Sequence, residues 1–181
     1  MSRIFLGNML FVGCVAFYLA WWLLAFRPVN PVTGVKSSWL LIPAAVLGVA
    51  ALGVAIYGIA SAGGERRLFN NGLVVLIWIV AFVVLAVATR WLFDRPVTSE
   101  LFLITGWTAL ALCEVNALFG SGKFSHNLAV VFIVVIAAIL VANLVCYVLF
   151  YRLGATARFV DGMIPLLLTG VATAVIGICA I

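Results

Sequence analysis

Six long apolar runs dominate this 181-residue chain, and such runs fold most readily as helices that cross a bilayer. A transmembrane helix needs about 20 consecutive apolar residues, because the hydrocarbon core is about 30 Å thick. Only 8% of the residues are charged, against about 25% in a soluble domain. The sequence therefore predicts an all-α integral membrane protein, with one membrane domain over residues 1–181. The six predicted spans cover residues 4–26, 38–62, 68–93, 98–120, 126–150 and 158–181.

The formal net charge of +5 does not indicate a nucleic-acid partner. The basic residues stand singly or in pairs at the ends of the apolar runs, where loops meet lipid headgroups. They are too scattered for a basic binding surface. The lipid bilayer is the partner that this pattern predicts, and we expect no nucleic acid.

The residues that usually hold metals or perform catalysis are scarce. All four cysteines (Cys14, Cys113, Cys146 and Cys179) lie inside predicted spans, none is in a CxxC pair, and His126 is the one histidine. This excludes the usual zinc spacings. We find no paired nucleophile and base, and the Gly120–Lys123 segment lacks the spacing of a phosphate-binding loop. We therefore expect no enzyme, no metal and no cofactor.

Lysine and arginine in the short loops predict the orientation in the membrane, because cytoplasmic loops carry an excess of both. The side that holds the two termini has four such residues, and the opposite side has six. This favours a multi-pass protein of the cell membrane with both termini outside. The four are Arg3, Arg66, Arg67 and Lys123, and the six are Arg27, Lys36, Arg90, Arg95, Arg152 and Arg158.

The two halves of the chain share short sequence matches. Phe69-Asn70-Asn71-Gly72 opens the third run and Phe159-Val160-Asp161-Gly162 opens the sixth, each after a basic residue. Arg27-Pro28-Val29 closes the first run, and Arg95-Pro96-Val97 leads into the fourth. Because three is an odd number of spans, a repeated three-helix unit must be inverted in the membrane. Inverted repeats are typical of transporters, whose solute path lies between the repeats.

Small residues line one face of the second predicted span. Ala44, Gly48, Ala51 and Ala55 follow helical spacing, so they share a face. Small residues at such spacing let helix backbones approach closely in lipid. We interpret this face as a packing surface, either within the subunit or between subunits.

Glu114 is the most informative polar residue, because it lies inside an unbroken apolar run from about residue 101 to 119. A carboxylate at membrane depth costs about 3 kcal/mol on insertion scales unless it faces a protein interior or a water-filled cavity. We therefore expect Glu114 to face the interior and to govern function. The alternative is a structural carboxyl bonded to Asn143 or to a backbone carbonyl.

Other residues could line a narrow path with Glu114. Trp107 lies seven residues before it on nearly the same face, and Asn143 is near the middle of the fifth span. The remaining candidates are Trp78 and Phe82 in the third span and Thr169 and Thr173 in the sixth. Aromatic walls with a few hydrogen-bonding groups suit the selection of a small polar solute. The alternatives are structural: threonine can bond its own backbone, and asparagine can link helices.

The two ends of the chain resemble the six-helix urea/amide channels, which include the proton-gated urea channel and the amidase-operon transporters. Leu10-Phe11-Val12-Gly13-Cys14-Val15 is similar to the family's opening Leu-Tyr-Val-Gly-x-Val. Val29-Asn30-Pro31 falls near its Val-x-Pro loop, and Gly170-Val171-Ala172-Thr173-Ala174 resembles Gly-Val-x-Thr-Ala of its last helix. The resemblance implies six helices, external termini and a ring of subunits, each with its own pore.

The chain departs from that family where the family's constriction is formed. Leu19-Ala20 replaces an Asn-Gly pair, and the fifth-helix tryptophans are missing between His126 and Tyr151. The family's aromatic third-helix run is here Val75-Leu76-Ile77-Trp78-Ile79-Val80-Ala81-Phe82. The resemblance therefore transfers no pore residue. We predict a channel or transporter for a small polar solute, with urea or a short amide as first candidate, in a homo-oligomer. The alternative is an accessory or structural subunit of a larger membrane complex.

Overall fold

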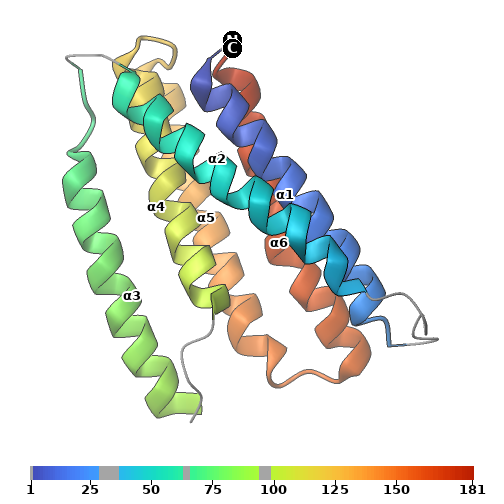
Figure 1. Cartoon of the computed structure of the whole chain (residues 1–181). Coiled ribbons are helices and arrows are strands. Elements are labelled where there is room, and N and C mark those ends of the chain that lie inside the picture. The colour runs from blue at the N-terminus through green and yellow to red at the C-terminus, as the bar shows by residue number, and fades with distance from the viewer. Residues whose placement is uncertain (1, 29–36, 63–65, 94–98) are drawn as a thin grey trace. The chain divides into compact units, whose positions relative to one another are not determined.

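The computed structural model describes residues 2–28, 37–62, 66–93 and 99–181, and its elements there are all helical (Figure 1). Six of the described helices are long and apolar enough to cross a membrane, which confirms the predicted all-α class and fits the six predicted spans of a multi-pass membrane protein. They are α1 (Arg3–Ala25), α2 (Leu41–Ser61), α3 (Asn71–Phe93), α4 (Ser99–Gly120), α5 (His126–Phe150) and α6 (Ala155–Cys179), with a short 3-10 helix, η1 (Ser37–Leu40), before α2.

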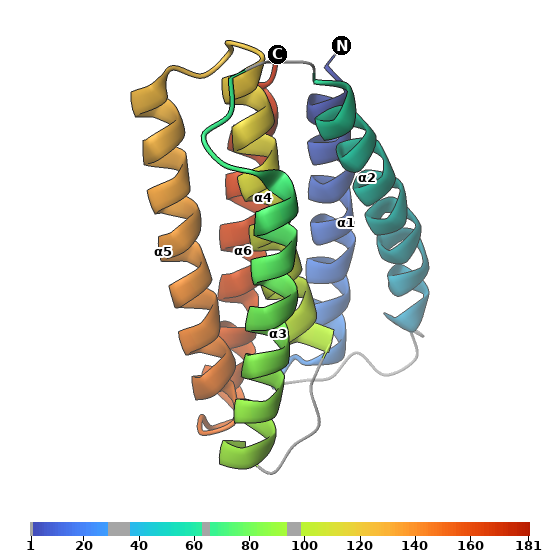
Figure 2. The same cartoon turned by 90° about the vertical axis from the view of Figure 1, so that its left-hand side faces the viewer.

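The helices form two compact units. Unit 1 consists of Met1–Ser61 and Val148–Ile181 and contains α1, α2 and α6. Unit 2 is Ala62–Tyr147 and contains α3, α4 and most of α5. Within unit 1, α1 packs against α2 and α6, and within unit 2, α3 packs against α4 (Figure 2). Each unit thus draws helices from both halves of the sequence. The single membrane domain stays a prediction.

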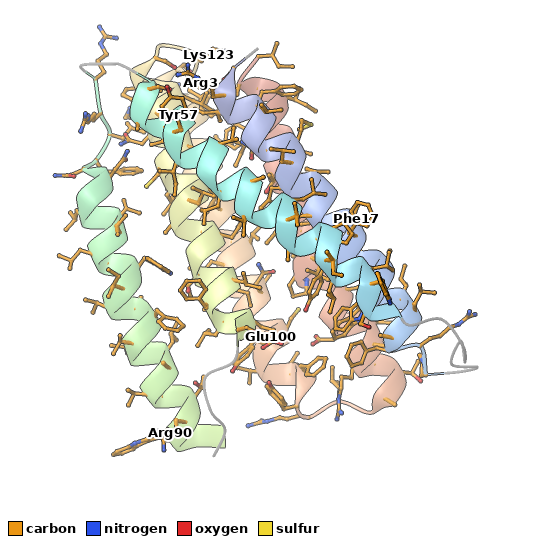
Figure 3. The ribbon with its side chains drawn as sticks, viewed as in Figure 1. Arg3, Phe17, Tyr57, Arg90, Glu100 and Lys123 are labelled. Atoms are coloured by element: carbon orange, nitrogen blue, oxygen red, sulfur yellow. The ribbon has the colours of Figure 1, made fainter. Side chains whose placement is uncertain are left out.

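The small-residue face of α2 packs against α1, inside the subunit. Ala51 and Ala55 are 1% and 2% exposed. A Cβ atom added to Gly7 of α1 would lie 3.0 Å from the backbone nitrogen of Ala55, so the two backbones nearly touch. At the ends of these helices, the Arg3 guanidinium lies 4.4 Å from the centre of the Tyr57 ring (Figure 3). The structure therefore confirms a packing face and assigns it to the subunit interior.

Glycines also bring α1 and α6 together. Asn8, Val15 and Trp22 are seven residues apart on α1, and each meets a glycine of α6. Cβ atoms added to Gly177 and Gly170 would lie 2.8 Å from Asn8 Cβ and 3.0 Å from Val15 Cγ1. One added to Gly162 would lie within 3.0 Å of the Trp22 indole. Trp22 also donates a hydrogen bond of 3.1 Å from Nε1 to the Phe159 carbonyl, which fixes the indole over α6.

The third helix begins at Asn71, three residues after the approximate start of the predicted span at residue 68. The Asn70 side-chain oxygen accepts a 2.8 Å hydrogen bond from the Gly72 amide, and the Asn70 carbonyl accepts one from the Val74 amide. An asparagine that binds the second amide of a helix is a favourable N-cap. This cap sets the helix start, whereas hydropathy had suggested an earlier one.

The sixth helix begins at Ala155, three residues before the predicted start. The Gly154 carbonyl accepts a 2.8 Å hydrogen bond from the Arg158 amide, so the helix begins in the polar segment outside the apolar run. The Arg158 side chain donates to the carbonyls of Phe150 and Leu153, each at 3.0 Å. One arginine thereby binds the last carbonyl of α5 and a carbonyl of the turn before α6.

The Gly120–Lys123 segment ends α4. Gly122 has a φ of 78°, in the left-handed region that glycine adopts without strain. The amides of Gly122 and Lys123 donate to the carbonyls of Phe119 and Leu118, both at 3.0 Å. These bonds satisfy the last carbonyls of the helix, so the segment is a helix C-cap.

Some sequence matches lie outside the described residues. These are Val29-Asn30-Pro31 of the family resemblance, Arg95-Pro96-Val97 of the repeat, and Lys36 of the charge comparison. The last residue of Arg27-Pro28-Val29 and the start of the fourth predicted span, at residue 98, also lie outside them. Helix α4, which corresponds to the fourth predicted span, begins at Ser99.

Candidate functional site

Glu114 is buried on α4, the helix with the greatest share of buried residues. Its side chain is 3% exposed, and Trp107, seven residues earlier, is 7% exposed. A helix that is apolar and buried on all sides belongs to the interior of its fold. Glu114 therefore lies in the protein interior, on the same helix and close to the same face as Trp107.

Asn143 is the most completely buried polar residue in the described part of the chain, with 0% exposure. The other buried residues of α5 are Ala129, Ile136 and Cys146. Ala129, Ile136 and Asn143 are seven residues apart, so they lie on nearly the same face of the helix. Neither Oδ1 nor Nδ2 of Asn143 has a hydrogen-bond partner among the described residues. Leaving a buried polar group unpaired costs about 1–3 kcal/mol, so this amide needs an explanation.

Trp78 and Phe82 lie on the side of α3 that packs against α4. Trp78 donates a hydrogen bond of 3.1 Å from Nε1 to the Thr105 hydroxyl, which itself donates to the Leu101 carbonyl at 2.9 Å. The Trp78 and Phe82 rings each stand edge-on to Phe102, with ring centres 5.4 Å apart. Both residues hold α3 to α4, and the Trp78 indole N–H is engaged in that packing.

The two threonines of α6 are buried, at 8% exposure for Thr169 and 4% for Thr173. The Thr169 hydroxyl donates to the Pro165 carbonyl at 2.7 Å, one turn earlier. This is the backbone bond that threonine commonly makes within a helix. Pro165 lies inside α6 and has no amide hydrogen to donate within the helix.

The predicted site residues fall into two groups. Unit 2 contains one group, with Trp78 and Phe82 on α3, Trp107 and Glu114 on α4, and Asn143 on α5. Unit 1 contains Thr169 and Thr173 on α6. Trp78 and Phe82 join α3 to α4 through their contacts with Thr105 and Phe102. The role of each of these residues in a solute path stays a prediction.

Asn116 is a buried polar residue whose role the sequence did not reveal. It is 2% exposed, near the end of α4, and it holds the segment before α3. Asn116 Oδ1 accepts from the Leu68 amide at 2.9 Å, and Nδ2 donates to the Phe69 carbonyl at 2.8 Å and to Asn71 Oδ1 at 2.6 Å. An asparagine in an apolar run was the available signal, but its partners are almost fifty residues away.

Two further buried polar residues lie on the α1 and α6 helices. Asn8 is 3% exposed and donates to the Ile4 carbonyl at 2.9 Å, and Asp161 is 7% exposed. Among the described residues, histidine, cysteine, aspartate and glutamate side chains do not gather in groups of three or more that could hold a metal ion.

Comparisons with models of protein families, with curated proteins and with solved structures give no match. The resemblance to the urea/amide channels therefore stays a prediction that rests on the end-helix motifs.

Proposed function

We propose that this chain is a multi-pass protein of the cell membrane that passes a small polar solute, with urea or a short amide as first candidate. The observation that carries the proposal is the unpaired, fully buried Asn143 amide on α5. Ionisable and polar groups at membrane depth are expensive, and they commonly mark solute or ion pathways. The buried carboxyl of Glu114 on α4 supports the same reading.

The burial of these two residues argues against the rival function. An accessory subunit would use its polar residues to bind a helix of a partner protein, so those residues would lie on the surface. Asn143 and Glu114 are 0% and 3% exposed, which leaves no surface for a partner helix to contact. A solute small enough to enter the protein fits their position better. The proposed homo-oligomer and the absence of catalysis stay predictions.

We also propose that the two halves form an inverted repeat in which the third helix of each half, α3 or α6, packs with the first helix of the other half. In such a repeat α1 corresponds to α4 and α6 to α3. The packing of α6 on α1 and of α3 on α4 has this symmetry. The two compact units, one with α1, α2 and α6 and the other with α4, most of α5 and α3, also correspond.

The matched phenylalanines give this repeat its most specific support. The Phe69 carbonyl accepts from Asn116, near the end of α4, and the Phe159 carbonyl accepts from Trp22, near the end of α1. Each is therefore held by a side chain from the corresponding helix of the other half. The local structures differ, since Phe69 precedes α3 whereas Phe159 lies in the second turn of α6.

Membrane topology provides a direct test of this arrangement. With both termini outside and six crossings, the start of α3 lies outside and the start of α6 inside.

In a chain whose native cysteines are replaced by alanine, we expect a membrane-impermeant maleimide to label Arg67→Cys on intact cells. We expect Arg152→Cys to react only after the membrane is opened. Both side chains are exposed. Labelling of both from one side would refute the inverted repeat, and a reversed pattern would place the termini inside.

Solute flux tests the function itself. In proteoliposomes, we expect urea or a short amide such as acetamide to equilibrate at least about tenfold faster than in protein-free vesicles, since the protein replaces a desolvation barrier with hydrogen bonds. Retention of trapped sucrose serves as the control for leakage. If a panel of small uncharged solutes crosses no faster than in protein-free vesicles, the proposed function is wrong.

A further inference from the structure

Asn143 differs from the other buried asparagines in its lack of partners. Asn116 uses both side-chain atoms to bind the segment before α3, and Asn8 donates to the Ile4 carbonyl. Neither side-chain atom of Asn143 has a hydrogen-bond partner among the described residues, although the residue is the most deeply buried of the three. The structural role that explains Asn116 therefore does not explain Asn143.

The surroundings of Asn143 restrict what could bind it. At 0% exposure, it cannot reach a helix of another subunit or lipid. It also makes no bond to its own backbone, unlike Thr169, whose hydroxyl binds the Pro165 carbonyl. The remaining partners are small molecules, namely water or the solute, and either must displace neighbouring side chains to reach a residue that is 0% exposed. Unpaired buried groups in native proteins commonly have a functional role or an unseen water as their explanation.

We infer that Asn143 determines specificity by pairing with an uncharged solute that presents a carbonyl oxygen and an N–H side by side. This rests on the proposed function and adds to it the group that recognises the solute. A carboxamide carries an acceptor and two donors in one plane, so it can form two parallel hydrogen bonds with another amide. A solute that lacks an N–H leaves Asn143 Oδ1 unpaired, and sites built for a hydrogen bond reject such analogues strongly.

The test uses Asn143→Leu and two isomeric solutes, propionamide, which has two N–H groups, and N,N-dimethylformamide, which has none. Fluxes into proteoliposomes are corrected for protein-free vesicles. We expect the parent to favour propionamide, and Asn143→Leu to lower the ratio of the two fluxes about tenfold, because the side chain can no longer pair with the N–H.

Thermal unfolding of the same variants separates recognition from a structural role. Leucine has the same branching and the same number of side-chain heavy atoms as asparagine, so Asn143→Leu should unfold at the same temperature as the parent or a higher one, since it removes an unpaired amide. Asn116→Leu is the matched control. It should unfold at a lower temperature, because it leaves the Leu68 amide and the Phe69 carbonyl without their partner.

The outcomes distinguish the two proposals. An unchanged flux ratio in Asn143→Leu, with transport intact, would overturn the inference and leave the proposed function standing. A fall in unfolding temperature as large as that of Asn116→Leu would also overturn it, because Asn143 would then be structural. If the parent passes neither these solutes nor any other, the proposed function fails and the inference fails with it.

Discussion

We expect Gly162→Ala to destabilise the folded chain by about 1–3 kcal/mol, the usual cost of overpacking a filled interior. The added methyl group would lie 2.8 Å from Trp22 Cη2 and 3.0 Å from Cε2. The indole cannot easily withdraw, because it is hydrogen-bonded to the Phe159 carbonyl and stacked on Phe26 with ring centres 4.4 Å apart. Thermal unfolding in detergent would measure the loss.

The chain offers a matched control for this substitution. Gly53 is an exposed glycine inside α2, and a Cβ atom there would have no other atom within 4 Å. Gly53→Ala should therefore stabilise the helix, by about 1 kcal/mol from intrinsic preference. Trp22→Phe, which shortens the ring, should restore part of the stability lost in Gly162→Ala. If both alanine variants unfold at the same temperature, or Trp22→Phe restores nothing, the contact between α1 and α6 is not as close as described.

The number and type of helices could be predicted because they depend on local sequence. Each apolar run is long enough to cross a bilayer, and hydropathy measures that length directly. Hydropathy does not determine where a helix begins. The Asn70 cap moves the start of α3 to Asn71, and the bond from the Arg158 amide to the Gly154 carbonyl moves the start of α6 to Ala155. These ends depend on backbone hydrogen bonds, which hydropathy does not report.

The partners of each helix could not be predicted, because they depend on contacts between distant segments. The spacing of Ala44, Gly48, Ala51 and Ala55 predicted a packing face, but not that α1 would cover it. The pairing of α6 with α1 depends on the match of three glycines with three larger residues on the facing helix.

The same limit applies to the candidate site. Asn116 and Asn143 look alike in the sequence, each a lone asparagine in an apolar run. Asn116 binds a segment that precedes it by almost fifty residues, whereas Asn143 has no partner among the described residues. The sequence analysis selected Asn143 as a candidate, but it assigned no role to Asn116. The hydrogen bonds of the fold were needed to distinguish the structural one.

We expect Glu114→Gln to fold like the parent and to abolish any dependence of solute flux on pH. Glutamine keeps the shape of the side chain and can donate and accept hydrogen bonds, but it does not titrate. Glu114 is 3% exposed on α4, so its protonation changes the charge of the interior. In the protonated form it can donate a hydrogen bond to a passing carbonyl, and in the ionised form it can bind a proton or a cation. Flux in proteoliposomes should be compared from about pH 4, near the ordinary pKa of glutamate, to about pH 9.

Glu100→Gln is the control, because it makes the same change on the same helix at an exposed position in the first turn. Its flux should follow that of the parent at every pH. If Glu114→Gln fails to fold while Glu100→Gln folds, Glu114 is a structural residue and the solute path does not depend on its titration. If both variants transport like the parent at every pH, Glu114 does not govern function. The two substitutions remove the same charge, but Glu114 is buried and Glu100 is exposed. Proton binding at Glu114 is therefore linked to transport if pH dependence is lost in Glu114→Gln and kept in Glu100→Gln.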